Sequence, residues 1–108
     1  MPKHIMVVFT DPTPDNDEQY NTWYNEVHLP EVLSTEGFVR AQRYKVSDMM
    51  PGVTDHGYVA IYEMETDDPK AAMKALRGQS KTFNLSDAAD LRHAKMFLAS
   101  AVSESIEG

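Results

Sequence analysis

Residues 23–32 read Trp-Tyr-Asn-Glu-Val-His-Leu-Pro-Glu-Val, and this stretch determines how the first half of the chain folds. Its large apolar side chains recur at helical spacing, which predicts a long first helix. Pro30 removes one backbone hydrogen bond and crowds the carbonyl of Glu26, so the helix either kinks there or restarts with Pro30 in its first turn. Because several of these large side chains carry polar tips, the pattern indicates a helix face that contacts a ligand.

The segments on either side of this helix have the patterns of strands. Residues 4–9 form a short apolar run rich in valine, which predicts a buried strand with both faces covered. Asp15 followed by Glu18 resembles a capping box at the start of the helix, and Glu36-Gly37 is expected to close it. Residues 38–46 alternate and predict a second strand with one polar face.

The second half of the chain repeats this alternation of element types. Turn-forming residues at 47–56 separate the second strand from the third. In the next helix, Pro69 occupies an early position, as proline commonly does. The expected elements are a strand at 58–64, a helix capped by Asp67 and ending at Gly78, one or two helical turns at 86–92, a strand at 95–102 and a polar tail.

The resulting order is strand, helix, strand, strand, helix, strand within a single domain of residues 1–108. This is the βαββαβ order of the ferredoxin-like plait, an α+β fold with a four-stranded antiparallel sheet and both helices on one face. The other face stays uncovered unless a second chain packs on it, so we expect a homodimer.

Charge and composition exclude several kinds of partner. The formal net charge is −7, and no Lys or Arg occurs between Thr10 and Phe38, so phosphate backbones and anionic lipids would be repelled there. We therefore expect no nucleic-acid and no membrane partner. The chain contains no cysteine, which excludes disulfides and thiolate catalysis. The apolar stretch near the start is too short for a signal segment, so a cytoplasmic location is expected.

A set of aromatic, histidine, proline and glycine residues in the first half carries a family resemblance. It comprises Tyr20, Trp23, Tyr24, His28, Pro30, Glu31, Gly37, Phe38, Arg43 and Tyr44. This set resembles the EthD-like branch of the dimeric α/β-barrel superfamily. The resemblance implies a pocket inside each protomer, between the helices and the sheet, with His28 reaching into it. It also implies small aromatic, polyketide-like or lactone substrates and no organic cofactor.

His28 and Tyr24 are the candidate catalytic residues. His28 can exchange a proton near neutral pH, and Tyr24 lies one helical turn before it, so the two side chains form a possible proton relay. Glu31 is placed to accept a hydrogen bond from the second imidazole nitrogen. In the alternative interpretation, His28 only stabilises the kink at Pro30 by bonding to a freed carbonyl. A metal site is not expected, because His28 and Glu31 supply only two ligands.

The candidate substrate-binding residues are Trp23, Glu31, Arg40, Tyr44 and Phe83. Trp23 either stacks on a planar substrate or packs in the core. Arg40 and Arg43 are expected on opposite strand faces, where one meets a substrate oxygen or pairs with surface acids. Phe83 either covers the pocket or belongs to an ordinary loop. Tyr44 is also suited to cross-strand packing or to the dimer surface.

The remaining histidines are assigned less specific places. His4 is expected to face either the pocket or the dimer sheet. His56 follows a turn and His93 precedes the last strand, so both are expected to be solvated.

Three functions are consistent with these features. The first is a cofactor-independent acid–base enzyme, an isomerase, cyclase, dehydratase or decarboxylase in the catabolism of aromatic compounds. The second is a non-catalytic small-molecule binding or accessory protein. The third is a cofactor-free monooxygenase, which would consume oxygen during turnover.

Overall fold

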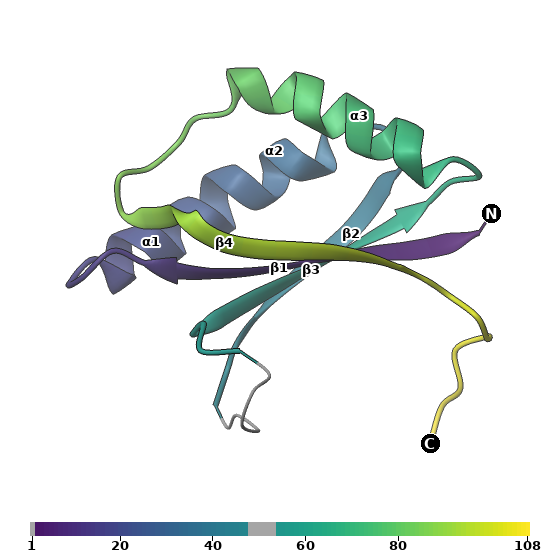
Figure 1. Cartoon of the computed structure of the whole chain (residues 1–108), viewed down its shortest axis with the longest axis horizontal. Helices are drawn as coiled ribbons and strands as arrows, with labels where there is room; N and C mark the ends of the chain where they lie inside the picture. Colours follow the sequence, from purple (N-terminus) through teal and green to yellow (C-terminus); the bar gives the residue numbers. More distant parts are fainter. Residues whose placement is uncertain (1, 48–53) are drawn as a thin grey trace.

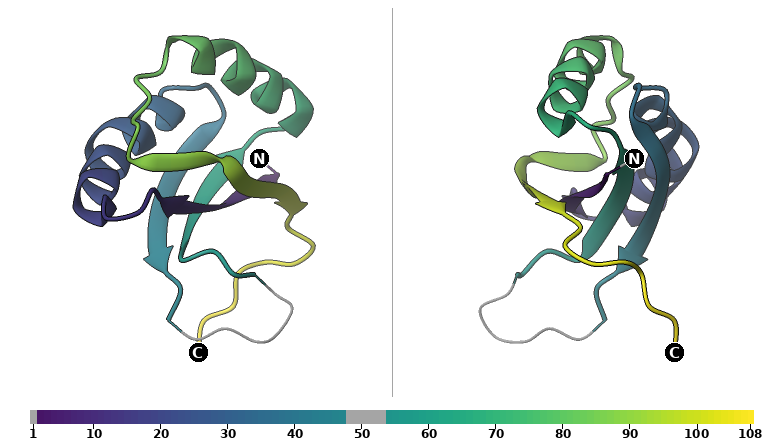
Figure 2. Two further views of the ribbon diagram at one scale, coloured as in Figure 1. Left: turned by 60° about the vertical axis from the view of Figure 1, so that its left-hand side comes forward. Right: turned by 90° about the vertical axis from the view of Figure 1, so that its right-hand side faces the viewer.

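A four-stranded antiparallel sheet in the order β2-β3-β1-β4 carries the helices on one face (Figures 1 and 2). The structure is a computed structural model that describes residues 2–47 and 54–108. The elements are β1 (Lys3–Pro12), α1 (Asp17–Trp23), η1 (Tyr24–His28), α2 (Leu29–Leu33), β2 (Phe38–Lys45), β3 (Tyr58–Glu65), α3 (Pro69–Gln79), η2 (Ser80–Thr82) and β4 (Ala89–Ser100). The predicted ferredoxin-like fold is confirmed.

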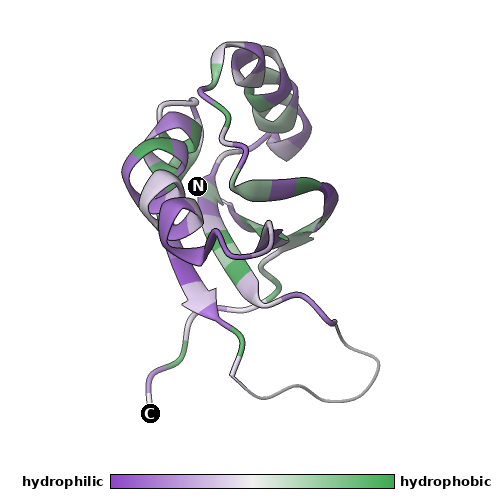
Figure 3. Cartoon of the chain, turned by 90° about the vertical axis from the view of Figure 1, so that its left-hand side faces the viewer, coloured by the Kyte–Doolittle hydropathy of each residue, from purple (hydrophilic) through white to green (hydrophobic). Residues whose placement is uncertain are grey.

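The strand register divides the sheet into a helix face and an outer face. Met6 pairs with Tyr62 on the helix face, and both side chains are buried in the core beneath the helices. The next residue of β1, Val7, points to the outer face and is also buried, so the central strand is covered at this point on both sides. On the surface that they turn to solvent, the helices carry many hydrophilic residues (Figure 3).

The first helix accommodates Pro30 by means of a π turn. The helix continues from α1 through η1, a π-helical segment in which the N–H of Leu29 bonds to the carbonyl of Tyr24. α2 then begins with Pro30 in its first turn, where no amide proton is required. The helical path therefore restarts with Pro30 in its first turn, which is one of the two predicted alternatives.

Both predicted helix caps are wrong by one residue. Asp15 has a φ of 66° and belongs to the turn before α1, while Asn16 occupies the cap position without a side-chain cap hydrogen bond. At α3, Asp68 rather than Asp67 caps the helix, because its Oδ1 accepts from the N–H of Ala71 at 3.0 Å. Acidic neighbours in sequence left these positions ambiguous.

The helical turns predicted at 86–92 are not formed, because this segment pairs with the end of β1. The N–H of Thr13 donates to the carbonyl of Ala88 at 2.7 Å, and Asp90 lies opposite Asp11 in the ladder. β4 consequently begins at Ala89, six residues before the predicted strand. Of the turn expected at 47–56, residues 48–53 lie outside the described part of the chain.

Candidate functional site

The π turn presents a cluster of aromatic rings around His28. The indole of Trp23 stacks on the imidazole with ring centroids 4.8 Å apart and an interplanar angle of 21°. Tyr24 meets the imidazole edge-on at 4.9 Å, and Phe83 does so at 5.9 Å from the loop that follows η2. We call Trp23, Tyr24, His28 and Phe83 the aromatic cluster. It joins the first helix to a segment more than 50 residues away in sequence.

The imidazole of His28 is held in its neutral form. Burial lowers the pKa of His28 below its ordinary value of 6.5, the Arg43 guanidinium lowers it further, and the Glu31 carboxylate opposes both effects. The Nδ1 atom is buried and has no hydrogen-bond partner among the residues that the structure describes. A neutral imidazole with an unpartnered nitrogen is able to accept a proton.

Glu31 does not hydrogen-bond to His28, contrary to the prediction. Its Oε2 accepts from the backbone N–H of Asn84 at 2.8 Å and from the Asn84 Nδ2 at 3.1 Å. Its Oε1 is buried and lacks a partner within residues 2–47 and 54–108. The carboxylate therefore turns toward the loop after η2 rather than back along its own helix.

Asn84 lies in the same loop as Phe83, and its hydrogen bonds within this site were not predicted from the sequence. Besides its contacts with Glu31, its carbonyl accepts from the indole Nε1 of Trp23 at 2.6 Å. These hydrogen bonds fix the loop that places Phe83 against His28. In the sequence, Asn84 stands out only by its position beside Phe83, because asparagine is common in loops.

The hydroxyl of Tyr24 bonds to another tyrosine rather than to His28. Tyr62 donates to the Tyr24 hydroxyl at 3.2 Å, and a second hydroxyl pair joins Thr10 to Tyr20. Burial raises the pKa of Tyr20, Tyr24 and Tyr62, so all three phenols are protonated at neutral pH. Tyr24 thus touches the imidazole through its ring, and its hydroxyl belongs to a buried network.

Arg40 and Tyr44 lie on the outer face of the sheet, away from the aromatic cluster. Arg40 forms an exposed ion pair with Glu63 at 3.4 Å, and Tyr44 is 46% exposed. Alternation along β2 places Arg43 on the helix face instead, with its guanidinium 4.2 Å from the Tyr24 ring centroid. The prediction that Arg40 and Arg43 face opposite ways is confirmed, but Arg43 rather than Arg40 reaches the site.

Among the pockets in the described part of the chain are four whose linings do not include His28. Beside the aromatic cluster, an open groove of about 470 Å³ is lined by Trp23 and Val27 with polar residues of the first helix. The hollow that the family resemblance implies at His28 is therefore not among these pockets. The rings of the cluster occupy the space next to the imidazole.

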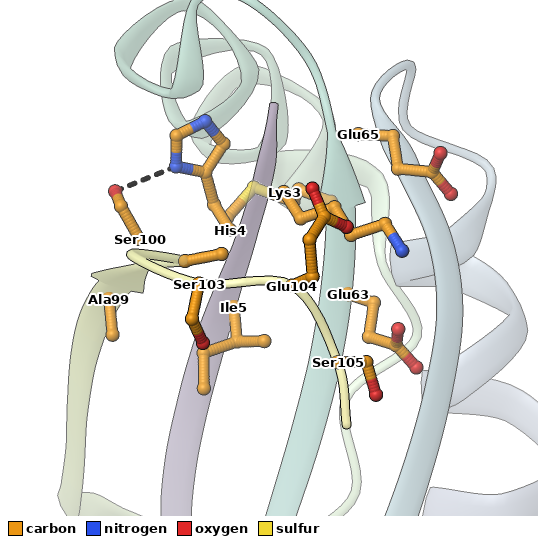
Figure 4. A pocket seen from close by; sticks show the side chains of 12 residues that line it. Lys3, His4, Ile5, Glu63, Glu65, Ala99, Ser100, Ser103, Glu104 and Ser105 are labelled. Carbon is orange, nitrogen blue, oxygen red and sulfur yellow. Dashed lines mark hydrogen bonds between the residues drawn. The ribbon is translucent and has the colours of Figure 1, made fainter. Parts of the chain in front are cut away.

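His4 lies at another pocket, between the sheet and the segment that follows β4 (Figure 4). This pocket has a volume of about 320 Å³. His4 is on the helix face, where its Nδ1 bonds to the Ser100 hydroxyl at 2.7 Å and its Nε2 to the carbonyl of Thr66 at 3.1 Å. Both ring nitrogens are engaged, and the side chain lies on the helix face rather than on the outer face of the sheet.

The prediction that His56 is solvated is wrong, whereas His93 is exposed as expected. His56 is only 5% exposed, because its Nδ1 bonds to the Asp11 carboxylate at 2.6 Å and its ring packs near Phe9. Its position after a turn gave no sign of this long-range partner. In the chain outside 48–53 and residue 1, no group of three His, Asp or Glu side chains is arranged to hold a metal ion.

Several solved structures share the architecture of this chain. An ethyl tert-butyl ether D (EthD) family protein of Bacillus halodurans C-125 shares 12% identity, with 98% of this chain and 100% of that chain covered and a TM-score of 0.58. SnoaB, a cofactor-independent oxygenase from Streptomyces nogalater, shares 17% identity, with 97% and 98% covered and a TM-score of 0.58. A dimeric ferredoxin-like protein from an uncultured marine organism shares 17% identity, with 97% and 100% covered and a TM-score of 0.62. These similarities confirm the dimeric α/β-barrel, EthD-like type of fold.

Within this class, the chain belongs to the family described as Domain of unknown function (DUF4286), whose model matches residues 4–94. No curated protein matches the chain. Over the parts that the structure describes, none of the helices is long and apolar enough to cross a membrane.

Proposed function

We propose that this chain is a cofactor-independent acid–base enzyme, of the isomerase or lyase type, in which His28 carries the proton and Tyr24 assists. The observation that supports it most directly is the buried, unpartnered Nδ1 of His28. Leaving a buried polar atom without a hydrogen bond costs about 1–3 kcal/mol, and such atoms are rare unless they have a functional role. A substrate hydroxyl or acidic C–H that reaches this nitrogen meets a neutral base.

The surroundings of His28 favour a small oxygenated aromatic, polyketide-like or lactone substrate. Trp23 and Phe83 supply apolar ring surfaces for a planar molecule. In this proposal the Tyr24 phenol, which stays protonated and accepts from Tyr62, donates its own proton in a hydrogen bond to an oxygen on which negative charge develops. In this proposal Phe83 is the side chain that moves aside to admit the substrate.

A second copy of this chain completes the proposed enzyme by packing on the outer face of the sheet. This face exposes large apolar residues, among them Tyr44 at 46% and Phe97 at 50%, and contiguous exposed apolar surface marks an interaction site. Likeness to the dimeric ferredoxin-like protein supports the proposal. Phe97→Asp should yield a monomer in analytical ultracentrifugation. Leu85→Asp, in the loop after η2, is the control that should leave a dimer intact.

The catalytic role is tested with a panel of hydroxylated aromatic acids and lactones. His28→Gln should retain binding, followed by isothermal titration calorimetry, and should lower kcat at least about 100-fold, the usual contribution of a positioned acid or base. His93→Gln, which alters an exposed histidine, is the matched control. Undiminished turnover in His28→Gln contradicts the proposal, and binding without any turnover in the unaltered chain favours the accessory binding protein instead.

A cofactor-free monooxygenase is the second candidate, because the solved structures with this fold include SnoaB, a cofactor-independent oxygenase. The two candidates differ in their use of oxygen. An oxygen electrode should record no consumption during turnover by an isomerase or lyase. Consumption in proportion to the product formed supports the monooxygenase.

A further inference from the structure

Arg43 links the edge strand β2 to the π turn of the first helix. Its Nη1 donates to the Asn25 side-chain oxygen at 2.8 Å, and its Nη2 donates to that of Asn21 at 3.0 Å. The two asparagines are four residues apart and so lie on one side of the helix. Asn25 belongs to the π turn and Asn21 to α1, so one guanidinium connects both segments to the sheet.

The same guanidinium contacts the tyrosine rings beneath the helix. It lies 4.2 Å from the ring centroid of Tyr24, 5.1 Å from that of Tyr20 and 5.4 Å from that of Tyr58. A cation within about 6 Å of an aromatic ring face is attracted to it, most strongly where water is excluded. Arg43 therefore holds the Tyr24 ring from the side of the sheet.

A π turn requires such support more than an ordinary helical turn does. π-helical segments are rare and occur mostly as single turns, frequently at functional sites. Here the π turn sets the separation between Tyr24 and His28, whose rings meet at an interplanar angle of 89°. Loss of the π geometry would rotate one of these rings away from the other.

We propose that Arg43 is a positioning residue of the His28 site, which fastens the π turn to β2 and holds Tyr24 edge-on against the imidazole. The inference rests on the proposed function, since that function gives the position of His28 its importance. Arg43 acts through Tyr24 and Asn25.

The charge of Arg43 adds an electrostatic effect to this geometry. Its hydrogen-bond acceptors at the helix are neutral amides rather than carboxylates, so these contacts do not neutralise the guanidinium. The positive charge lowers the pKa of His28, in opposition to Glu31. A lysine at this position would keep the charge but lose the fork of two parallel donors.

The experiment compares Arg43→Met, Arg43→Lys and Asn25→Ala with Arg40→Met, which removes an arginine from the outer face of the same strand. NMR titration follows the imidazole signals of His28, assigned by their loss in His28→Gln, and amide hydrogen exchange is measured for residues 24–29. Arg43→Met should raise the pKa of His28 and accelerate exchange about tenfold, the effect of losing roughly one hydrogen bond of net stability.

The other variants separate geometry from charge. Arg43→Lys should keep the His28 pKa close to that of the unaltered chain, yet accelerate exchange in the π turn. Asn25→Ala should likewise keep the His28 pKa and accelerate exchange in the π turn. Because Asn25 is exposed, this variant keeps the test valid if Arg43→Met does not fold. Exchange rates and a His28 pKa equal to those of Arg40→Met would overturn the inference. Both readouts are independent of turnover, so a failure of the proposed enzyme activity would be seen separately.

Discussion

His28 is half-buried and His56 is buried, and their ring nitrogens have opposite surroundings. His56 bonds through Nδ1 to Asp11 Oδ2 at 2.6 Å, and Asp11 Oδ1 in turn accepts from the N–H of Gly57 at 2.7 Å. His28 has aromatic rings on three sides and a buried Nδ1 without a partner in the described residues. A histidine whose hydrogen bonds are satisfied serves the fold, whereas an unsatisfied one keeps its capacity for chemistry at a cost in stability.

The position of His56 explains what its hydrogen bond does for the fold. Asp11 lies near the end of β1, whereas His56 and Gly57 immediately precede β3. The contact therefore anchors the start of β3 to the strand beside it. This role depends on the Asp11 carboxylate. Removal of Asp11 should therefore distinguish the structural role of His56 from the role of His28 most clearly.

The largest expected effect on stability follows from Asp11→Ala. It leaves the buried imidazole of His56 without its acceptor and should lower the free energy of unfolding by about 2 kcal/mol, a value reduced because the Asp11 side chain is 34% exposed. Urea denaturation measures it. A loss no larger than that of Asp90→Ala, which removes the partner of the exposed His93, would show that the Asp11 contact is not structural.

The second largest expected effect is a loss of folding stability at acidic pH, and it depends on His28. Its pKa in the folded chain lies below the ordinary 6.5, so the unfolded chain binds the proton more tightly. The contribution of His28 to stability is fully present above pH 6.5 and is lost as the pH falls from there through the folded pKa, at about 1.4 kcal/mol per pH unit.

His28→Gln removes this dependence. The free energy of unfolding of the unaltered chain, relative to that of His28→Gln, should decrease as the pH is lowered below 6.5 and should be constant above it. Denaturation at a series of pH values, with all other histidines present in both proteins, provides the measurement. A difference that does not change with pH would mean that His28 is solvated in the folded chain.

The smallest effect is expected at His93, which bonds to Asp90 at 2.9 Å but has 73% of its side chain exposed. Exposed pairs of this kind contribute little to stability. His93→Gln should therefore leave the urea midpoint unchanged. The pKa of Asp90, which the hydrogen bond from His93 holds below its usual range, should rise in an NMR titration. A lower urea midpoint would show that the pair of His93 and Asp90 stabilises the fold, as the pair of His56 and Asp11 is expected to do.

The sequence predicts most of the architecture, because short-range patterns carry it. Alternation and helical spacing identify the strands and helices, and the proline at position 30 signals the restart of the first helix. The segment 86–92 was misassigned, because pairing of its backbone with β1 outweighs local preference. Each helix cap lies one residue from its predicted position, because neighbouring polar side chains suit the same role.

The candidate site is predicted only in part. Trp23, Tyr24 and His28 lie together because helical spacing brings them there, and Phe83 joins them across the fold. The pairing of Glu31 with Asn84 could not be foreseen, because it joins residues that are 53 positions apart.

The sequence by itself determined the order of the elements, the apolar and polar faces and the grouping of Trp23, Tyr24 and His28 on the first helix, since each depends on neighbours within a turn or a strand. Only the tertiary structure decided the choice between Arg40 and Arg43, the burial of His56 and the π turn that sets the angle between Tyr24 and His28. These features depend on contacts between distant segments, whose free energies no local pattern records.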